Sequence, residues 1–165
     1  MEITHKRIVL PADKEYILER HCRINYECDT PWKRQMTYEA YQREWFSLKE
    51  QTDEFLDMLI ESCRDSRSIA DILWIQGEIA GYLWVPFSAS EENNFAFAEI
   101  QDIYVEPAYR NSGIASYLFT YAENHARQSG AKVIRSGTGC ENMPSVGLHK
   151  KMGYYQYRFE FEKLL

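Results

Sequence analysis

The sequence lacks several features that define other classes of protein. It has no apolar run that approaches the length needed to span a membrane, and no positively charged start followed by the apolar stretch of an export signal. Its four cysteines (Cys22, Cys28, Cys63 and Cys140) form no C-x-x-C pair, and none clusters with histidine at a spacing typical of a metal site. We therefore expect a cytoplasmic protein with reduced thiols, no membrane partner and no bound metal.

An excess of basic residues is also missing. The chain has 19 Lys and Arg residues against 25 Asp and Glu residues, which gives a formal net charge of −6 at pH 7. Non-specific binding to nucleic acids or anionic membranes requires the opposite balance, so neither is an expected partner. The acidic balance mildly favours a cationic partner such as an amine, although carboxylates on solvated helix faces account for the same number.

The sequence does contain enough apolar material for one folded domain. Its 165 residues are 45% hydrophobic and 15% aromatic, and no repeat, low-complexity tract or linker divides them. The patterning predicts a strand over residues 4–10, a helix over 13–28, helical stretches capped by Thr37 and Thr52, a hairpin over 68–87, a polar loop over 88–94, a strand over 95–105, a helix from 114 that ends near Gly130, a strand over 132–138, a helix over 144–152 and a final strand over 154–162. This order predicts a single domain, 1–165, built on a mixed α/β (α+β) sheet.

Residues 95–126 form the most informative stretch. Aromatic and β-branched side chains predict a strand that ends at Glu106-Pro107, and apolar residues at helical spacing follow from Ile114. Between them lies the sequence R-N-S-G-I-A, residues 110–115, at the start of a helix whose first four N–H groups have no partner inside it. Such a loop can bind a phosphate group. It can equally be an ordinary connection in which Arg110 and Gly113 only shape the turn.

Two motifs follow each other in the second half of the chain. Residues 110–115 match the pattern R/Q-x-x-G-x-G/A, with alanine in the final place. Residues 142–154, N-M-P-S-V-G-L-H-K-K-M-G-Y, match N-x-x-A-x-x-L-Y-E-K-L-G-F at Asn142, Leu148, Gly153 and Tyr154. In this order the two motifs resemble the GNAT superfamily of N-acetyltransferases, which transfer an acetyl group from acetyl-coenzyme A to an amine. The competing dinucleotide fingerprint G-x-G-x-x-G is absent.

The resemblance implies a fold and a binding mode. The expected fold is a mixed, mostly antiparallel sheet with helices on both faces and a splayed central pair of strands. The helix start would hold the pyrophosphate of acetyl-coenzyme A, and backbone groups freed by a bulge in the central strand would hold its peptide-like pantetheine arm. Asn142 would contact the arm from the other side, with Ser145 near the thiol. The implied cofactor-binding residues are Ile103, Tyr104, Val105, Arg110, Asn111, Ser112, Gly113, Ile114, Ala115, Ser116, Asn142 and Ser145.

The chemistry of amide formation requires a group that takes a proton from the acceptor. Attack on a thioester needs a neutral amine, whereas an alkyl ammonium has a pKa of about 10. Glu99 is the first candidate for this base, because its position relative to Arg110 matches that of the glutamate base in histone-type members of the family. Asp102 is the second, although it lies on the opposite strand face unless a bulge turns it. The alternative for Glu99 is a solvated or paired charge near a strand end.

The departing thiolate needs a proton or a donor, and a histidine is the candidate. His149 stands where the family usually has tyrosine, and imidazole can donate a proton near neutral pH. The alternative is that His149 only packs. The remaining histidines, His5, His21 and His125, are expected to pack or face solvent, and a covalent route through Cys140 is less favoured than direct transfer.

The predicted function is therefore acetylation of a primary amine, most simply that of a small cationic metabolite. Five aromatic residues could wall the acceptor pocket, and Trp32 is the best candidate among Tyr26, Trp32, Tyr38, Tyr41 and Trp45. Three alternatives stay open: an acyl-coenzyme A sensor without turnover, a protein N-terminal or lysine acetyltransferase, and a protein-interaction domain without a nucleotide. The aromatic final strand could also pair two copies into a homodimer.

Overall fold

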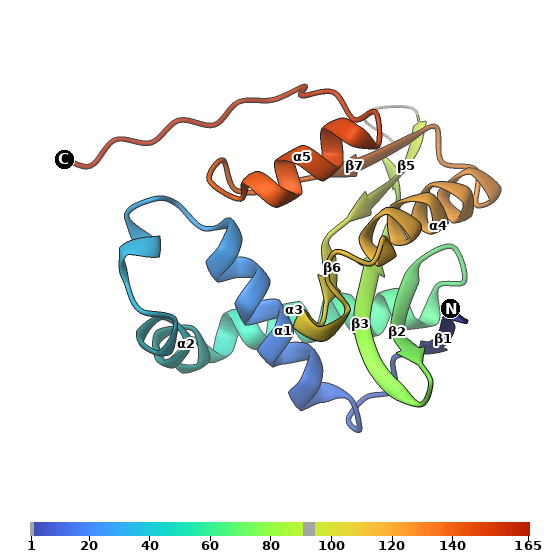
Figure 1. The fold of residues 1–165 in the computed structure, drawn as a ribbon, viewed down its shortest axis with the longest axis horizontal. Coiled ribbons are helices and arrows are strands. Elements are labelled where there is room, and N and C mark those ends of the chain that lie inside the picture. Colours follow the sequence, from blue (N-terminus) through green and yellow to red (C-terminus); the bar gives the residue numbers. More distant parts are fainter. Residues whose placement is uncertain (1, 91–94) are drawn as a thin grey trace.

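The computed structural model places helices on both sides of a central sheet that divides at one end (Figure 1). It describes residues 2–90 and 95–165. The elements in chain order are β1 (Thr4–Arg7), α1 (Lys14–Cys28), the short 3₁₀ helix η1 (Lys33–Gln35), α2 (Tyr38–Ser47), α3 (Lys49–Arg64), β2 (Ile69–Ile75), β3 (Glu78–Val85), β4 (Phe87–Ser90), β5 (Phe95–Ile100), β6 (Asp102–Val105), the 3₁₀ helix η2 (Pro107–Tyr109), α4 (Ile114–Gln128), β7 (Val133–Ser136) and α5 (Met143–Lys151). Within the described ranges no helix is both long and apolar enough to cross a membrane.

The strands form two sheets that share one continuous central segment. The first sheet has the order β1-β2-β3-β6, and all its pairs are antiparallel. The second has the order β4-β5-β7, in which β5 pairs antiparallel with β4 and parallel with β7. Only Gln101 separates β5 from β6, so the chain leaves one sheet and enters the other at that residue. The strands β6 and β7 therefore diverge, which confirms the predicted mixed, mostly antiparallel fold with a splayed central pair.

A change of side-chain direction accompanies this change of sheet. On a regular strand Ile100 and Tyr104 would lie on the same face. Instead Ile100 packs in the cluster on the α4 side, and Tyr104 packs in the cluster on the α1 side. An irregularity at Gln101 thus reverses the alternation, as a β-bulge does. It follows that Glu99 and Asp102 both face the α1 side.

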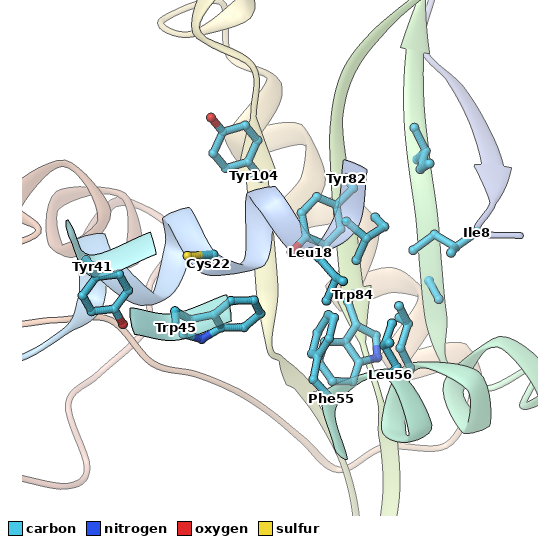
Figure 2. Packing of buried hydrophobic residues seen from close by; sticks show 14 residues of the cluster. Ile8, Leu18, Cys22, Tyr41, Trp45, Phe55, Leu56, Tyr82, Trp84 and Tyr104 are labelled. Carbon is cyan, nitrogen blue, oxygen red and sulfur yellow. The ribbon is translucent and has the colours of Figure 1, made fainter. Parts of the chain in front are cut away.

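Each face of the sheet has its own hydrophobic core. On one face α1, α2 and α3 pack against Tyr82 and Trp84 of β3, with Trp45 and Phe55 among the large rings (Figure 2). On the other face α4 packs against β2, β3 and β5, with Phe119 fully buried. The indole N–H of Trp84 donates to Ser62 Oγ at 2.8 Å, so the one polar atom of this ring is satisfied inside the first core.

Most predicted elements lie where the sequence patterns indicate. The hydroxyl oxygen of Thr37 accepts from the Ala40 N–H at 3.3 Å at the start of α2, as an N-cap does. The hairpin between β2 and β3 turns at Gln76 and Gly77, whose φ angles of 52° and 87° fit a two-residue turn. The prediction for Thr52 is wrong: α3 already begins at Lys49, and the Thr52 hydroxyl donates back to the Leu48 carbonyl at 3.1 Å.

Two other predictions need correction. The polar loop over 88–94 begins with strand β4, and residues 91–94 lie outside the described residues. The predicted final strand over 154–162 is wrong, because no strand of the described chain pairs with residues 155–165, which run as an exposed extended segment (Figure 1). Its aromatic rings (Tyr155, Tyr157, Phe159 and Phe161) are between 57% and 93% exposed. Alternation reports two faces of different polarity, whereas a strand also requires a neighbour to bond with.

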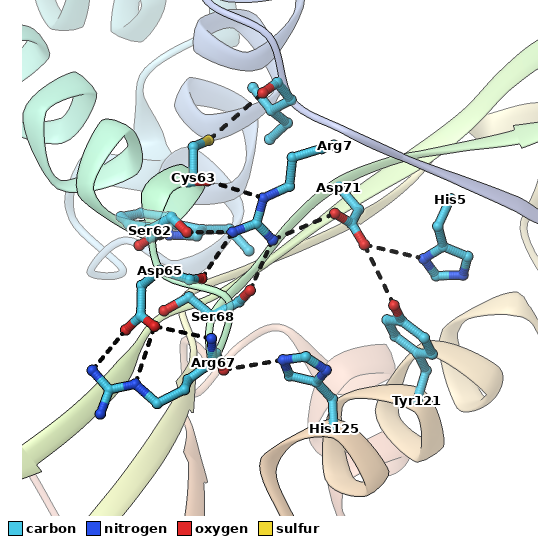
Figure 3. A network of polar contacts seen from close by, with 12 residues as sticks. His5, Arg7, Ser62, Cys63, Asp65, Arg67, Ser68, Asp71, Tyr121 and His125 are labelled. Carbon is cyan, nitrogen blue, oxygen red and sulfur yellow. Dashed lines mark hydrogen bonds and ion pairs between the residues drawn. The ribbon is translucent and has the colours of Figure 1, made fainter. Parts of the chain in front are cut away.

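Arg7 on β1 closes the C-terminal end of α3 (Figure 3). Its guanidinium donates to the carbonyl oxygens of Ser62, Cys63, Asp65 and Ser68 at 2.5, 3.4, 3.0 and 2.8 Å. It also forms an ion pair with Asp71 at 3.7 Å. The last carbonyls of a helix have no partner inside it and carry partial negative charge. Because one cation satisfies several of them, we expect Arg7→Met to lower the free energy of unfolding by about 2–3 kcal/mol in urea titrations.

Arg64 supplies the matched control for this prediction. It lies on α3 itself, its side chain is exposed, and its ion-pair partner is Glu61, one turn away. We expect Arg64→Met to change the free energy of unfolding by less than about 0.5 kcal/mol. Equal losses in the two variants would show that the contacts of Arg7 add nothing beyond a surface charge.

Candidate active site

The start of helix α4 presents unpaired backbone donors at the surface. The first helical hydrogen bond runs from the Tyr117 N–H to the Gly113 carbonyl at 3.0 Å, so the N–H groups of Ile114, Ala115 and Ser116 have no partner inside the helix. No side chain caps this end. Gly113 has a φ of 88°, and a Cβ added there would meet nothing within 4 Å. The backbone is therefore open to a ligand, and its donors and dipole favour an anion.

The loop before this helix is tied to the end of β6. The Arg110 Nε donates to the Val105 carbonyl at 3.0 Å, and its guanidinium lies 5.5 Å from the centre of the Tyr104 ring. The Ser112 hydroxyl donates to the Tyr109 carbonyl at 2.5 Å. These contacts place an exposed cation beside the helix start, so one loop offers both a positive side chain and backbone donors to the same ligand.

The outer edge of β6 faces the split between the sheets. The Glu106 N–H donates to the Ala80 carbonyl of β3 at 2.9 Å. Because neighbouring residues of a strand point their backbone groups to opposite sides, the N–H and C=O groups of Ile103 and Val105 point away from β3. The Val105 carbonyl accepts from Arg110, and the other groups face the split. A peptide-like ligand can pair with such an edge.

Helix α5 begins after Asn142, close to Cys28 at the end of α1. The side chain of Asn142 is its N-cap, because Oδ1 accepts from the Ser145 N–H at 3.4 Å, and Nδ2 lies 3.9 Å from Cys28 Sγ. His149 Nδ1 donates to the Ser145 carbonyl at 2.8 Å, and His149 Nε2 lies 2.8 Å from Ser136 Oγ of β7. Both ring nitrogens of His149 are thus engaged by the fold.

The two candidate carboxylates share a face but differ in their surroundings. Glu99 is half-buried on β5, where it lies beside Arg135 of β7 in the strand register. Asp102 is 2% exposed and accepts two hydrogen bonds on Oδ2, from the Tyr82 hydroxyl at 2.6 Å and from His21 Nδ1 at 2.7 Å. Burial, and then the charge of Asp102, raise the pKa of Tyr82 well above its usual range. Tyr82 therefore stays a donor, and Asp102 is held inside a network.

A hollow of about 430 Å³ opens between the end of α1 and helix α2. Its lining residues are Asn25, Cys28, Asp29, Lys33, Tyr41, Glu44, Trp45, Leu48 and Gln51. Two of the five aromatic residues proposed from sequence, Tyr41 and Trp45, are in this set. Trp32 is not; it is 41% exposed, and its indole N–H donates to Glu162 of the C-terminal segment at 3.3 Å.

Sequence reasoning missed the pair formed by His21 and Asp102. His21 was expected only to pack or face solvent, yet its imidazole bonds to the buried carboxylate at the point where the central strand changes sheet. The two residues are 81 positions apart, so no local spacing connects them. The carboxylates of the hollow, Asp29 and Glu44, carry no motif either.

Comparison with known proteins establishes the class. Residues 34–154 match the model of the Acetyltransferase (GNAT) family, which is well over half of the chain. The chain belongs to the GNAT acetyltransferase family, a family that uses acetyl-coenzyme A as acyl donor.

The chain is also similar to individual proteins. An aminoalkylphosphonate N-acetyltransferase of Salmonella typhimurium is 30% identical over 89 residues, which are 54% of this chain and 58% of that protein. The chain therefore spans little more than half the length of this relative. A putative acetyl transferase from Pyrococcus furiosus has a TM-score of 0.65 at 24% identity and covers 99% of this chain and 100% of its own.

A further solved structure contains a coenzyme A derivative. It is AAC(6')-Iy in complex with the bisubstrate analogue CoA-S-monomethyl-acetylneamine, with a TM-score of 0.61 at 14% identity, covering 100% of this chain and 99% of that one. At these identities the two solved structures support the fold alone.

Proposed function

We propose that this protein is an acetyl-coenzyme A-dependent N-acetyltransferase that transfers the acetyl group directly to the primary amine of a small cationic molecule. One observation carries the proposal: the unpaired N–H groups at the start of α4, beside Arg110, lie next to the open edge of β6. An anionic group with an attached peptide-like arm fits this arrangement. Membership of the GNAT family supports the same assignment.

The cofactor contacts follow from this geometry. Arg110, Asn111, Ser112, Gly113, Ile114, Ala115 and Ser116 would surround the pyrophosphate, Ile103, Tyr104 and Val105 would border the pantetheine arm, and Asn142 and Ser145 would approach it from α5. When bound, acetyl-coenzyme A supplies an activated acetyl group as a thioester. Backbone N–H groups of β6 that face the split could hold the carbonyl oxygen as negative charge develops on it.

Two side chains are proposed for proton transfer. Glu99 faces the α1 side of the split and would take the proton that an ammonium must lose before it can attack. His149 would give a proton to the departing thiolate. Since both of its ring nitrogens have partners, this role requires the ring to exchange Ser136 or the Ser145 carbonyl for the sulfur.

The acceptor would enter from the side of α1 and α2. The hollow there combines two carboxylates, Asp29 and Glu44, with the aromatic rings of Tyr41 and Trp45, which is a chemistry that suits a cation. Lys33 forms an ion pair with Glu44, so an ammonium group of this chain already occupies one of these carboxylates. Trp32 remains a proposed contact at the edge. The name of the Salmonella typhimurium relative, an aminoalkylphosphonate N-acetyltransferase, also favours a small amine over a protein.

A direct test combines binding with turnover. We expect coenzyme A to raise the melting temperature, and thiol release from acetyl-coenzyme A to appear with at least one of (2-aminoethyl)phosphonate, neamine, spermidine and a lysine peptide. Binding without thiol release would identify a sensor, and release with the peptide alone would identify a protein acetyltransferase. The absence of any shift with coenzyme A would favour a protein-interaction domain.

The two ends of α4 provide a matched pair of variants for the phosphate-binding loop. Gly113 and Gly130 have φ angles of 88° and 87°, and a Cβ at either position meets nothing within 4 Å. Alanine at each site therefore carries the same backbone strain, about 1–2 kcal/mol in the free energy of unfolding. We expect Gly113→Ala to weaken coenzyme A binding about 10-fold or more in calorimetric titrations, because the added methyl group keeps the diphosphate away from the backbone.

Gly130→Ala is the control for strain alone. It should match the stability loss of Gly113→Ala and leave the affinity for coenzyme A unchanged. Equal affinities in the two variants would place the diphosphate elsewhere.

A further inference from the structure

A histidine–carboxylate pair connects helix α1 to strand β6. His21 Nδ1 is 2.7 Å from Asp102 Oδ2, and the same oxygen accepts from the Tyr82 hydroxyl at 2.6 Å. Asp102 is 2% exposed, so its charge is held by these two hydrogen bonds. A carboxylate can only accept hydrogen bonds, and therefore the proton of the neutral imidazole is on Nδ1. The lone pair of the ring is on Nε2.

Aromatic rings fix the direction of this imidazole. The His21 ring stacks on Phe55 of α3 with centroids 3.8 Å apart and an angle of 16°, and Trp45 of α2 meets it edge-on at 5.8 Å (Figure 2 shows both aromatic partners). The side chain of His21 keeps 15% of its surface accessible. The groups that face it are thus two aromatic rings from α2 and α3 and the Asp102–Tyr82 pair from β6 and β3. Among the described residues Nε2 has no hydrogen-bond partner.

The pair is located where the proposed reaction would occur. Asp102 is the first residue after Gln101, at which the central strand passes from one sheet to the other. The reversal of side-chain direction there puts Asp102 and Glu99 on the same face of the sheet, under α1. Trp45, which contacts the His21 ring, also lines the hollow between α1 and α2.

We propose that His21, oriented by Asp102, accepts the second proton that the amine nitrogen loses during acetyl transfer. This inference rests on the proposed function. In this proposal the Nε2 of His21 would contact the reacting nitrogen, which would make His21 a catalytic residue. Asp102 would be a positioning residue that keeps the lone pair on Nε2 and stabilises the imidazolium. Tyr82 holds the carboxylate in place.

The amine nitrogen loses two protons in the course of the reaction. An ammonium loses one proton, to Glu99 in our proposal, before its lone pair can form the C–N bond. The nitrogen then carries two protons and a positive charge, and an amide retains only one of them, so the second proton goes to His21. The C–S bond breaks with its electron pair on sulfur, and the thiolate takes one proton from His149. The sum is an amide, a free thiol and one proton released to solvent when Glu99, His21 and His149 are returned to their starting states.

His5 makes a matched control possible. It is a second half-buried histidine beside a carboxylate, with Nδ1 at 3.5 Å from Asp71 Oδ2 (Figure 3). It lies on β1, at the opposite edge of the sheet from β6. The experiment compares wild type with His21→Gln, Asp102→Asn and His5→Gln. It measures thiol release from acetyl-coenzyme A with (2-aminoethyl)phosphonate, neamine and spermidine from pH 6 to 9, coenzyme A affinity, melting temperature, and the ¹⁵N resonances of the imidazoles.

We expect His21→Gln and Asp102→Asn to lower kcat about 10- to 100-fold, with coenzyme A affinity within 2-fold of wild type, while His5→Gln keeps wild-type turnover. The ¹⁵N spectrum of wild type at pH 8 should show His21 protonated on Nδ1.

An Nε2–H tautomer, or equal turnover in His21→Gln and His5→Gln, would overturn the assignment of His21 and leave the proposed acetyltransferase activity intact. No thiol release by wild type with any of the three amines would instead remove the proposed function and this inference with it. Should His21→Gln fail to fold, Asp102→Asn and the tautomer decide.

Discussion

Glu99→Gln is expected to lower kcat for amine acetylation at pH 7 by about 100-fold or more, the usual contribution of a general base. Glutamine keeps the size of the side chain and removes its capacity to accept a proton. Because an alkyl ammonium has a pKa of about 10, the deficit should shrink as the pH rises and the neutral amine becomes more abundant. The measurement is the pH dependence of thiol release with whichever amine of the panel reacts fastest.

Coenzyme A binding should be unaffected in this variant, since Glu99 lies on the face opposite to α4. Glu50→Gln is the control: Glu50 is exposed at the start of α3 and undergoes the same change of charge. If the kcat of Glu99→Gln at pH 7 is within 3-fold of the wild-type value, Glu99 is not the base.

Gly81→Ala is expected to destabilise the fold by about 3 kcal/mol or more, measured by urea or thermal unfolding. Gly81 lies on β3 opposite β6, and a Cβ there would be 2.1 Å from the Tyr104 carbonyl oxygen and 3.2 Å from Val105 Cα. These are backbone atoms, which cannot rotate away as a side chain does. The strand β6 would have to move, and with it the edge that faces the split.

Gly147→Ala is a glycine substitution in the same protein that we expect to increase stability rather than lower it. Gly147 is inside helix α5, and a Cβ there meets nothing within 4 Å. Alanine should stabilise the helix by about 0.5–1 kcal/mol, because glycine loses more conformational freedom on folding. Destabilisation by both substitutions would indicate that contact with Tyr104 is not what sets the cost at Gly81.

Several local signals predicted parts of the fold correctly, although the proposed cap at Thr52 did not. Thr37, the Gln76-Gly77 turn and Gly153 each determine the backbone within a few residues, and the structure has them at the ends of elements as expected. The boundary between α2 and α3 was not predictable, because Leu48 separates them without a capping side chain. The prediction of a final strand over 154–162 was wrong for a different reason. The alternation of apolar and polar residues describes the segment itself and does not show whether a sheet has a free edge strand to pair with it.

In the candidate site, too, local features could be predicted from the sequence and long-range contacts could not. The loop before α4 is one contiguous sequence at a helix start, so its anion-binding geometry can be read from residues 110–116. Which face Asp102 occupies depends on the irregularity at Gln101, and the contact with His21 depends on how α1 crosses β6; neither leaves a pattern in the sequence. Tertiary packing decides these contacts.

The transfer of the central strand from one sheet to the other has an evolutionary consequence. One core joins this strand to α4, where the donor would bind, and a separate core joins it to α1, α2 and α3, where the amine would enter. Substitutions that reshape the helices of the first layer therefore leave the diphosphate loop in place. We expect descendants of such a protein to change their acceptor amine readily while the reaction with the thioester stays the same. Sequence differences among them should be concentrated before residue 65, and residues after 99 should vary less.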